Sequence, residues 1–114
     1  MLEDELRKNI FTFLKSADLI YQTGDHTSAT ILYFKTLFSV LDLIILKKEG
    51  KVPKDHEERF RVLETKFQSL YSVLDNIFRI YRATYRTAIS KDDCEKVKKN
   101  VREIIEGYKI TERD

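Results

Sequence analysis

The chain has 114 residues, of which 42% are hydrophobic and 35% charged, and its formal net charge is +2. This length suits one domain spanning residues 1–114, and the composition excludes a disordered chain. Three glycines and one proline provide too few turn residues for an all-β fold, and so small a net charge does not demand a nucleic-acid partner.

The cellular location is expected to be cytoplasmic. Cys94 is the single cysteine, which excludes a disulfide within the chain and suits a reducing compartment. The first residues are charged rather than apolar, so we expect no signal peptide. The most apolar run, residues 37–46, is about half as long as a membrane span and contains Asp42. We therefore expect no transmembrane helix.

The first helix is expected at residues 3–22, because apolar side chains recur there at spacings of three and four along one face. Gly24 ends this helix, since glycine adopts the left-handed conformation without steric cost. The second helix is expected at residues 27–49, with Asp25 or Ser28 capping its first amides. Gly50 ends it, and Pro53 prevents its continuation.

The second helix is apolar around most of its circumference, apart from a narrow polar strip that includes Lys35, Ser39 and Asp42. A helix of this kind is buried on more than one side. In a domain this small, one side faces the bundle core, and we expect a second copy of the chain to cover the other. Asp42 is interpreted as an exposed or paired residue on the strip rather than as a perturbed functional acid.

Residues 55–88 carry an apolar pattern that is long for one globular helix, so we expect a kink or break near Gln68 and Ser69 that separates a third from a fourth helix. Asp55 and Glu58 form a pair of the capping-box type at the start. A last helix begins after the capping residue Ser90 and carries Cys94 on its apolar face. The sequence thus predicts an all-α, up-and-down antiparallel bundle of four to five helices.

Arg79, Arg82 and Arg86 are the candidate binding residues, because offsets of three and seven place them on one face of the fourth helix. Guanidinium groups bind phosphate in a bidentate manner, and Tyr85 beside them can stack on a base. The alternative is a solvated arginine face with an Asp75–Arg79 ion pair, which the charge pattern alone favours.

His26 and His56 each lie near the start of a helix, where either can titrate or bind a metal. Neither has a second ligand at metal-site spacing, so we expect structural or solvent-facing roles, with no metal and no cofactor. Cys94 is expected to be a small core residue.

Three stretches resemble, in their order and spacing, the HEPN family of small prokaryotic helical domains, including its uncharacterised archaeal and bacterial members. They are residues 24–26 before the apolar helix, residues 50–56 with His56, and residues 70–85 with their arginines and tyrosines. The resemblance implies an up-and-down bundle that dimerises. Some members of the family are ribonucleases, often toxins paired with a small nucleotidyltransferase-type antitoxin.

The resemblance also implies a ribonuclease motif, in which four to six residues separate an arginine from a histidine. Arg79 matches the arginine, but Thr84, Tyr85 and Arg86 occupy the positions for the histidine. Counting the same spacing from Arg82 also reaches no histidine. Tyrosine and arginine are poor bases near neutral pH.

We therefore expect a non-catalytic, HEPN-like homodimer that binds RNA, a nucleotide or a partner protein through Arg79, Arg82, Tyr85 and Arg86. One alternative is a divergent metal-independent ribonuclease that uses Arg79 with His56. The other is a structural partner subunit of a nucleotidyltransferase-like protein.

Overall fold

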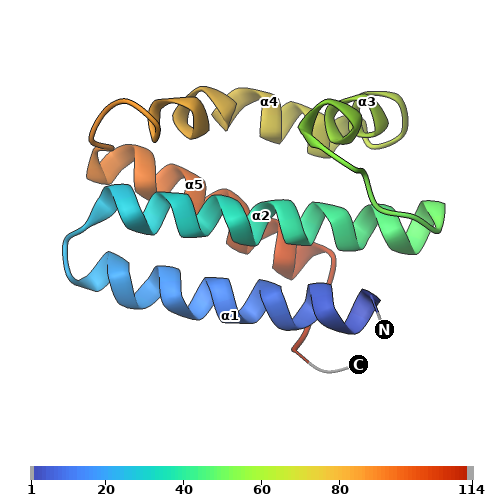
Figure 1. The fold of residues 1–114 in the computed structure, drawn as a ribbon, viewed down its shortest axis with the longest axis horizontal. Helices are drawn as coiled ribbons and strands as arrows, with labels where there is room; N and C mark the ends of the chain where they lie inside the picture. Colours follow the sequence, from blue (N-terminus) through green and yellow to red (C-terminus); the bar gives the residue numbers. More distant parts are fainter. Residues whose placement is uncertain (1, 113–114) are drawn as a thin grey trace.

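The computed structural model describes residues 2–112, and this part of the chain contains helices and no strand. The all-α prediction is therefore confirmed. Four of the helices run alternately in opposite directions along the molecule, and a short one fills the corner between the second and fourth (Figure 1). The helices are α1 (Leu2–Gln22), α2 (His26–Glu49), α3 (His56–Lys66), α4 (Gln68–Ala83) and α5 (Lys91–Gly107).

The helix ends follow the local sequence signals. Side chains of Asp25, Asp55 and Ser90 each accept a hydrogen bond from the amide three residues later, at 3.0, 2.9 and 3.1 Å. Gly50 ends α2 with φ +82°, and its amide donates to the Leu46 carbonyl at 2.8 Å. These caps were predicted because each depends only on residues within one turn of the chain.

Two helix boundaries differ from expectation. The break between α3 and α4 falls at Phe67, one residue early, where the backbone leaves the helical region with φ −140° and ψ 63°. Helix α4 ends at Ala83 rather than near Ala88. The Thr84 hydroxyl donates to the Tyr81 carbonyl at 2.6 Å, and such side-chain bonds offer the backbone an alternative to continuing the helix.

Helix α2 is the central helix of the bundle. Helices α1 and α5 pack against it, and α4 lies over its remaining side (Figure 1). Tyr33, Phe34, Leu37 and Leu41 are completely buried by these neighbours. The expectation that α2 needs a second chain to cover it is therefore wrong, because the chain's own helices enclose it. The burial of α2 therefore no longer supports a homodimer, and the homodimer stays a prediction.

Within residues 2–112, α2 is also the one helix long and apolar enough to cross a membrane, with 24 residues and a mean hydropathy of 1.8 over its most apolar window. The sequence argument considered only residues 37–46 and so missed this length. In the bundle 61% of the window is buried, as expected of a core helix. The cytoplasmic location stays a prediction.

Candidate functional site

The four candidate residues Arg79, Arg82, Tyr85 and Arg86 line one hollow of about 530 Å³ at the C-terminal end of α4. We call it the arginine hollow; Ala83 and Thr87 complete its lining. The prediction that helix four carries all of these residues is wrong, because Tyr85 and Arg86 lie in the turn after Ala83. The turn keeps them close, since the Arg86 amide still donates to the Ala83 carbonyl at 3.0 Å.

The three guanidinium groups have different surroundings. Arg79 lies 3.6 Å from a carboxylate oxygen of Asp93 on α5, whereas the sequence had suggested Asp75 as its partner. Arg82 lies over the Phe78 ring, 5.3 Å from its centroid. Within residues 2–112, neither Arg82 nor Arg86 forms an ion pair. Two of the three cations are therefore available to an anionic ligand.

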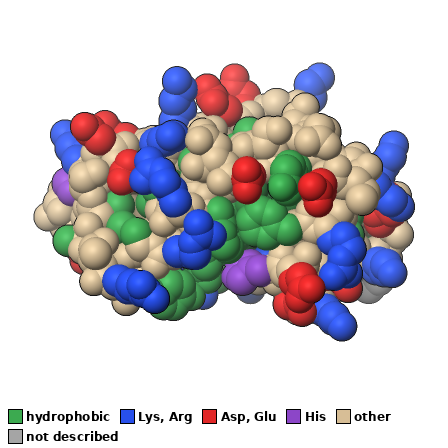
Figure 2. Space-filling view, turned by 90° about the horizontal axis from the view of Figure 1, so that it is seen from above, with side chains coloured by type: hydrophobic (Ala, Val, Ile, Leu, Met, Phe, Trp, Pro, Cys, Tyr) green, Lys and Arg blue, Asp and Glu red, His purple; other side chains and the backbone are tan. Residues whose placement is uncertain are grey.

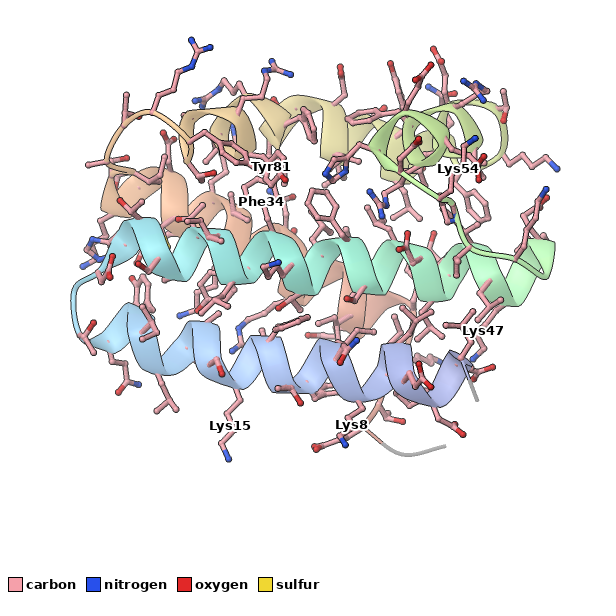
Figure 3. All side chains as sticks on the ribbon, in the orientation of Figure 1. Lys8, Lys15, Phe34, Lys47, Lys54 and Tyr81 are labelled. Carbon is pink, nitrogen blue, oxygen red and sulfur yellow. The ribbon has the colours of Figure 1, made fainter. Side chains whose placement is uncertain are left out.

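An aromatic cluster joins the arginine hollow to the core. The Tyr81 ring contacts Phe34 and Phe38 of α2 edge-on, with centroids 5.2 and 5.1 Å away. On its outer side Tyr81 meets Tyr85, whose ring stands at 88° to it and whose side chain is 74% exposed. Figure 2 shows apolar side chains surfacing over α3 and α4, with lysines and arginines around them. In Figure 3, Phe34 and Tyr81 meet between α2 and α4.

A chain of polar side chains runs beneath these rings. The Asp42 carboxylate accepts two hydrogen bonds from Arg59, at 2.9 and 3.1 Å. Arg59 lies 2.7 Å from Nδ1 of His56, and Nε2 of His56 lies 3.3 Å from the Tyr81 hydroxyl. The Tyr81 hydroxyl lies 2.8 Å from that of Tyr85. We call these five residues the polar chain.

The chemistry of its members fixes the direction of the hydrogen bonds from Arg59 as far as Tyr81. A guanidinium group can only donate, so Nδ1 of His56 accepts from Arg59. The neutral ring then carries its proton on Nε2 and donates it to the Tyr81 hydroxyl. Between the two tyrosine hydroxyls either can be the donor, and when Tyr81 donates, the Tyr85 proton is left for a ligand. In that arrangement the chain presents a hydrogen-bond donor at the arginine hollow.

The pKa values agree with this arrangement. Burial lowers the pKa of His56, and the neighbouring Arg59 cation lowers it further, so the ring is neutral near pH 7. Burial, together with the hydrogen bond to Tyr85, raises the pKa of Tyr81 to about 12. Both groups thus keep the protonation states that the directed chain requires.

His56 does not meet the arginine of the expected ribonuclease pair. Its ring contacts Arg59, Tyr81 and the flanking phenylalanines, whereas Arg79 pairs with Asp93. Both nitrogens of His56 also have partners within the chain. His56 therefore reaches the arginine hollow only through the two tyrosines, as a positioning residue.

The remaining candidates have structural surroundings. His26 packs edge-on against Tyr21, with centroids 5.4 Å apart. Cys94 is fully buried on α5, as predicted, and burial raises the pKa of its thiol. Over residues 2–112, no group of three or more His, Cys, Asp and Glu residues is suited to hold a metal ion.

Sequence reasoning missed Arg59, which links Asp42 to His56. The signal available was its position three residues after His56, which places both on one face of α3. The partner on α2 is seventeen residues distant in sequence, and no local pattern connects them. The interpretation of Asp42 as a paired residue is confirmed, with Arg59 as the partner.

Comparison of the chain with protein-family models, curated proteins and solved structures finds no match in any of the three. The HEPN resemblance therefore stays a prediction, and the functional argument depends on the geometry of the site.

Proposed function

We propose that this protein binds single-stranded RNA in the arginine hollow, without cleaving it. The observation that carries the proposal is the juxtaposition of two guanidinium groups without ion-pair partners and an exposed tyrosine whose hydroxyl is hydrogen-bonded to Tyr81. Arginine forks hold phosphate oxygens, and an exposed aromatic ring stacks on a base. These are the two elements of sequence-tolerant single-strand binding.

A single strand fits this site better than a duplex. Tyr85 is 74% exposed, and its ring can stack only on a base that is free of its own neighbours. Because Tyr81 fixes the other side of Tyr85, little side-chain freedom is lost when a base binds. The Tyr85 hydroxyl can then donate to a phosphate or base oxygen.

The test is the salt dependence of binding, measured by fluorescence anisotropy of a labelled single-stranded RNA. Two arginine–phosphate contacts, from Arg82 and Arg86, give a slope of about −1.4 in log affinity against log salt, so raising the salt from about 50 to 200 mM weakens binding roughly sevenfold. The R82A/R86A variant removes both of these contacts and should show a slope near zero over the same range.

The matched control is K8A/K15A, which removes the same charge from α1, where both lysines point away from the bundle (Figure 3). This variant should bind with the slope of the unmodified protein. If the two double variants lose affinity and slope equally, attraction to the overall charge explains binding and the proposed site is wrong.

Absence of cleavage is tested separately, by incubating the RNA with the purified protein in a chelator across a range of pH. The expected result is intact RNA, because both nitrogens of His56 are already engaged. Cleavage that disappears in His56→Ala would instead support the ribonuclease alternative.

A further inference from the structure

A second hollow, of about 470 Å³, lies at the other end of the bundle, where α2, α3 and α5 all terminate (Figure 1). Its volume falls in the range of about 300–1,000 Å³ that is usual for pockets that hold small molecules. We call it the lysine hollow. The apolar part of its lining consists of Leu43, Ile44, Phe67, Tyr108 and Ile110. The basic part consists of Arg7, Lys47, Lys48, Lys66 and Lys109.

The basic side chains outnumber the carboxylates that pair with them. Glu3 lies 2.8 Å from Arg7 and 3.8 Å from Lys47, and Glu49 lies 2.6 Å from Lys66. Across residues 2–112, Lys48 and Lys109 take part in no ion pair. Figure 3 shows Lys47 beside the start of α1, at the edge of this region. The lining is thus positive overall and apolar at its base.

Lys109 occupies a backbone conformation that lysine rarely adopts. Its φ is +54°, and over residues 2–112 it is the one residue other than glycine with a positive φ. The amide of Lys109 donates to the Glu106 carbonyl at 3.1 Å, and that of Ile110 to the Ile105 carbonyl at 2.9 Å. This pair of bonds is a Schellman motif, in which glycine is the usual residue at the left-handed position.

A strained residue that persists at a concave site suggests a use for its side chain. Lysines at helix C-termini also complement the helix dipole, which explains Lys47, Lys48 and Lys66 without a ligand. That role does not explain a lysine at the position where glycine would relieve strain. The side chain of Lys109 lines the hollow, and the turn it forms folds Ile110 back into the apolar lining.

We propose that the lysine hollow binds a small amphipathic carboxylate, with its apolar body against Leu43, Ile44 and Phe67 and its head group between Lys48 and Lys109. Neither the apolar body nor the head group of the ligand should bind tightly without the other. The apolar lining supplies burial and the unpaired lysines supply charge. The site is independent of the arginine hollow.

The probe is decanoate below its micellar concentration, titrated into ¹⁵N-labelled protein. Acetate supplies the head group alone and decanol the apolar body alone. Decanoate should shift the amide resonances of residues 43–48 and 107–111 in a saturable manner, and the two fragments should bind at least tenfold more weakly. Equal shifts with decanol would overturn the assignment of the lysines, and no saturable shift with decanoate would overturn the site.

The decisive variant is Lys109→Gly, because strain and binding predict opposite effects. It should raise the melting temperature by a few degrees and weaken decanoate binding at least fivefold. Lys48→Ala should weaken binding with little change in melting temperature, and Lys15→Ala, the matched control on α1, should alter neither. A Lys109→Gly protein that is more stable and binds decanoate as tightly as before would show that Lys109 is only a helix cap, and the proposal would be wrong.

Discussion

Replacing Asp42 by asparagine tests the polar chain at its buried end. The Arg59 side chain is 9% exposed and that of Asp42 15%, so the pair is largely removed from water. Asparagine removes the negative charge. Its amide nitrogen, which is a donor, also replaces one of the two oxygens that accept a hydrogen bond from Arg59. The guanidinium group is then buried without a counter-charge, a change that costs about 3–5 kcal/mol in comparable pairs.

The lower end of this range applies here. Arg59 retains its contact with the Phe38 ring, 4.9 Å from the centroid, and the remaining amide oxygen still accepts one hydrogen bond. We therefore expect Asp42→Asn to lower the free energy of unfolding by about 3 kcal/mol. In a domain of this size the melting temperature should fall by roughly 10–15 °C. Urea denaturation followed by circular dichroism at 222 nm measures the change.

Two further variants decide the interpretation. Glu49→Gln breaks the Lys66–Glu49 pair, in which the lysine is 56% exposed, and should cost less than about 1 kcal/mol. The D42L/R59M double variant removes both buried charges and should lie within about 1 kcal/mol of the unmodified protein. The reasoning about the buried pair is refuted if Asp42→Asn costs no more than Glu49→Gln. It is also refuted if D42L/R59M loses as much stability as the single variants D42L and R59M lose together.

Other predictions concern pH and the exposed tyrosine. Because the pKa of His56 is lowered in the folded state, the unfolded chain binds more protons just below pH 6.5, so stability should fall as the pH drops through this region. Urea midpoints measured from about pH 7 to 5 should show this fall, and His56→Gln should flatten it; an unchanged slope would contradict the assignment. In the RNA assay, Tyr85→Phe keeps the ring and should bind a few-fold more weakly, whereas Tyr85→Ala should lose about tenfold or more. Equal affinities for the two variants would show that the base does not stack on Tyr85.

The sequence predicted those features that depend on neighbouring residues. Asp25, Asp55 and Ser90 cap the helices as expected, because a cap involves one turn of backbone. Arg79 and Arg82 share a surface for the same reason, since residues three apart lie on one face of a helix. Helical periodicity thus predicted positions as far as α4 extends; beyond it, the turn after Ala83 brings Tyr85 and Arg86 to the same hollow.

Features that join distant segments were not predictable in this way. The apolar circumference of α2 showed that more than one side is buried, but not whether the cover comes from the same chain or from another. The pairing of Asp42 with Arg59 depends on how α3 is placed against α2. Phe67, where α3 gives way to α4, leaves the helical backbone region, and the sequence does not show how the chain turns there. The tyrosines of α4 were visible in the sequence, but not the contacts that Tyr81 makes with Phe34 and Phe38 of α2.

The polar chain links the core to the arginine hollow, and this link has a measurable consequence. A core filled by Asp42, Arg59 and His56 gives no more stability than an apolar one of the same shape, so stability alone does not account for it. Its effect at the surface is to position the Tyr85 hydroxyl through the hydrogen bond with Tyr81. The D42L/R59M variant should therefore fold as stably as the unmodified protein and still bind RNA more weakly, by the same few-fold factor as Tyr85→Phe. Undiminished RNA affinity in that stable variant would mean that Tyr85 is oriented by ring packing alone and that the chain serves only the fold.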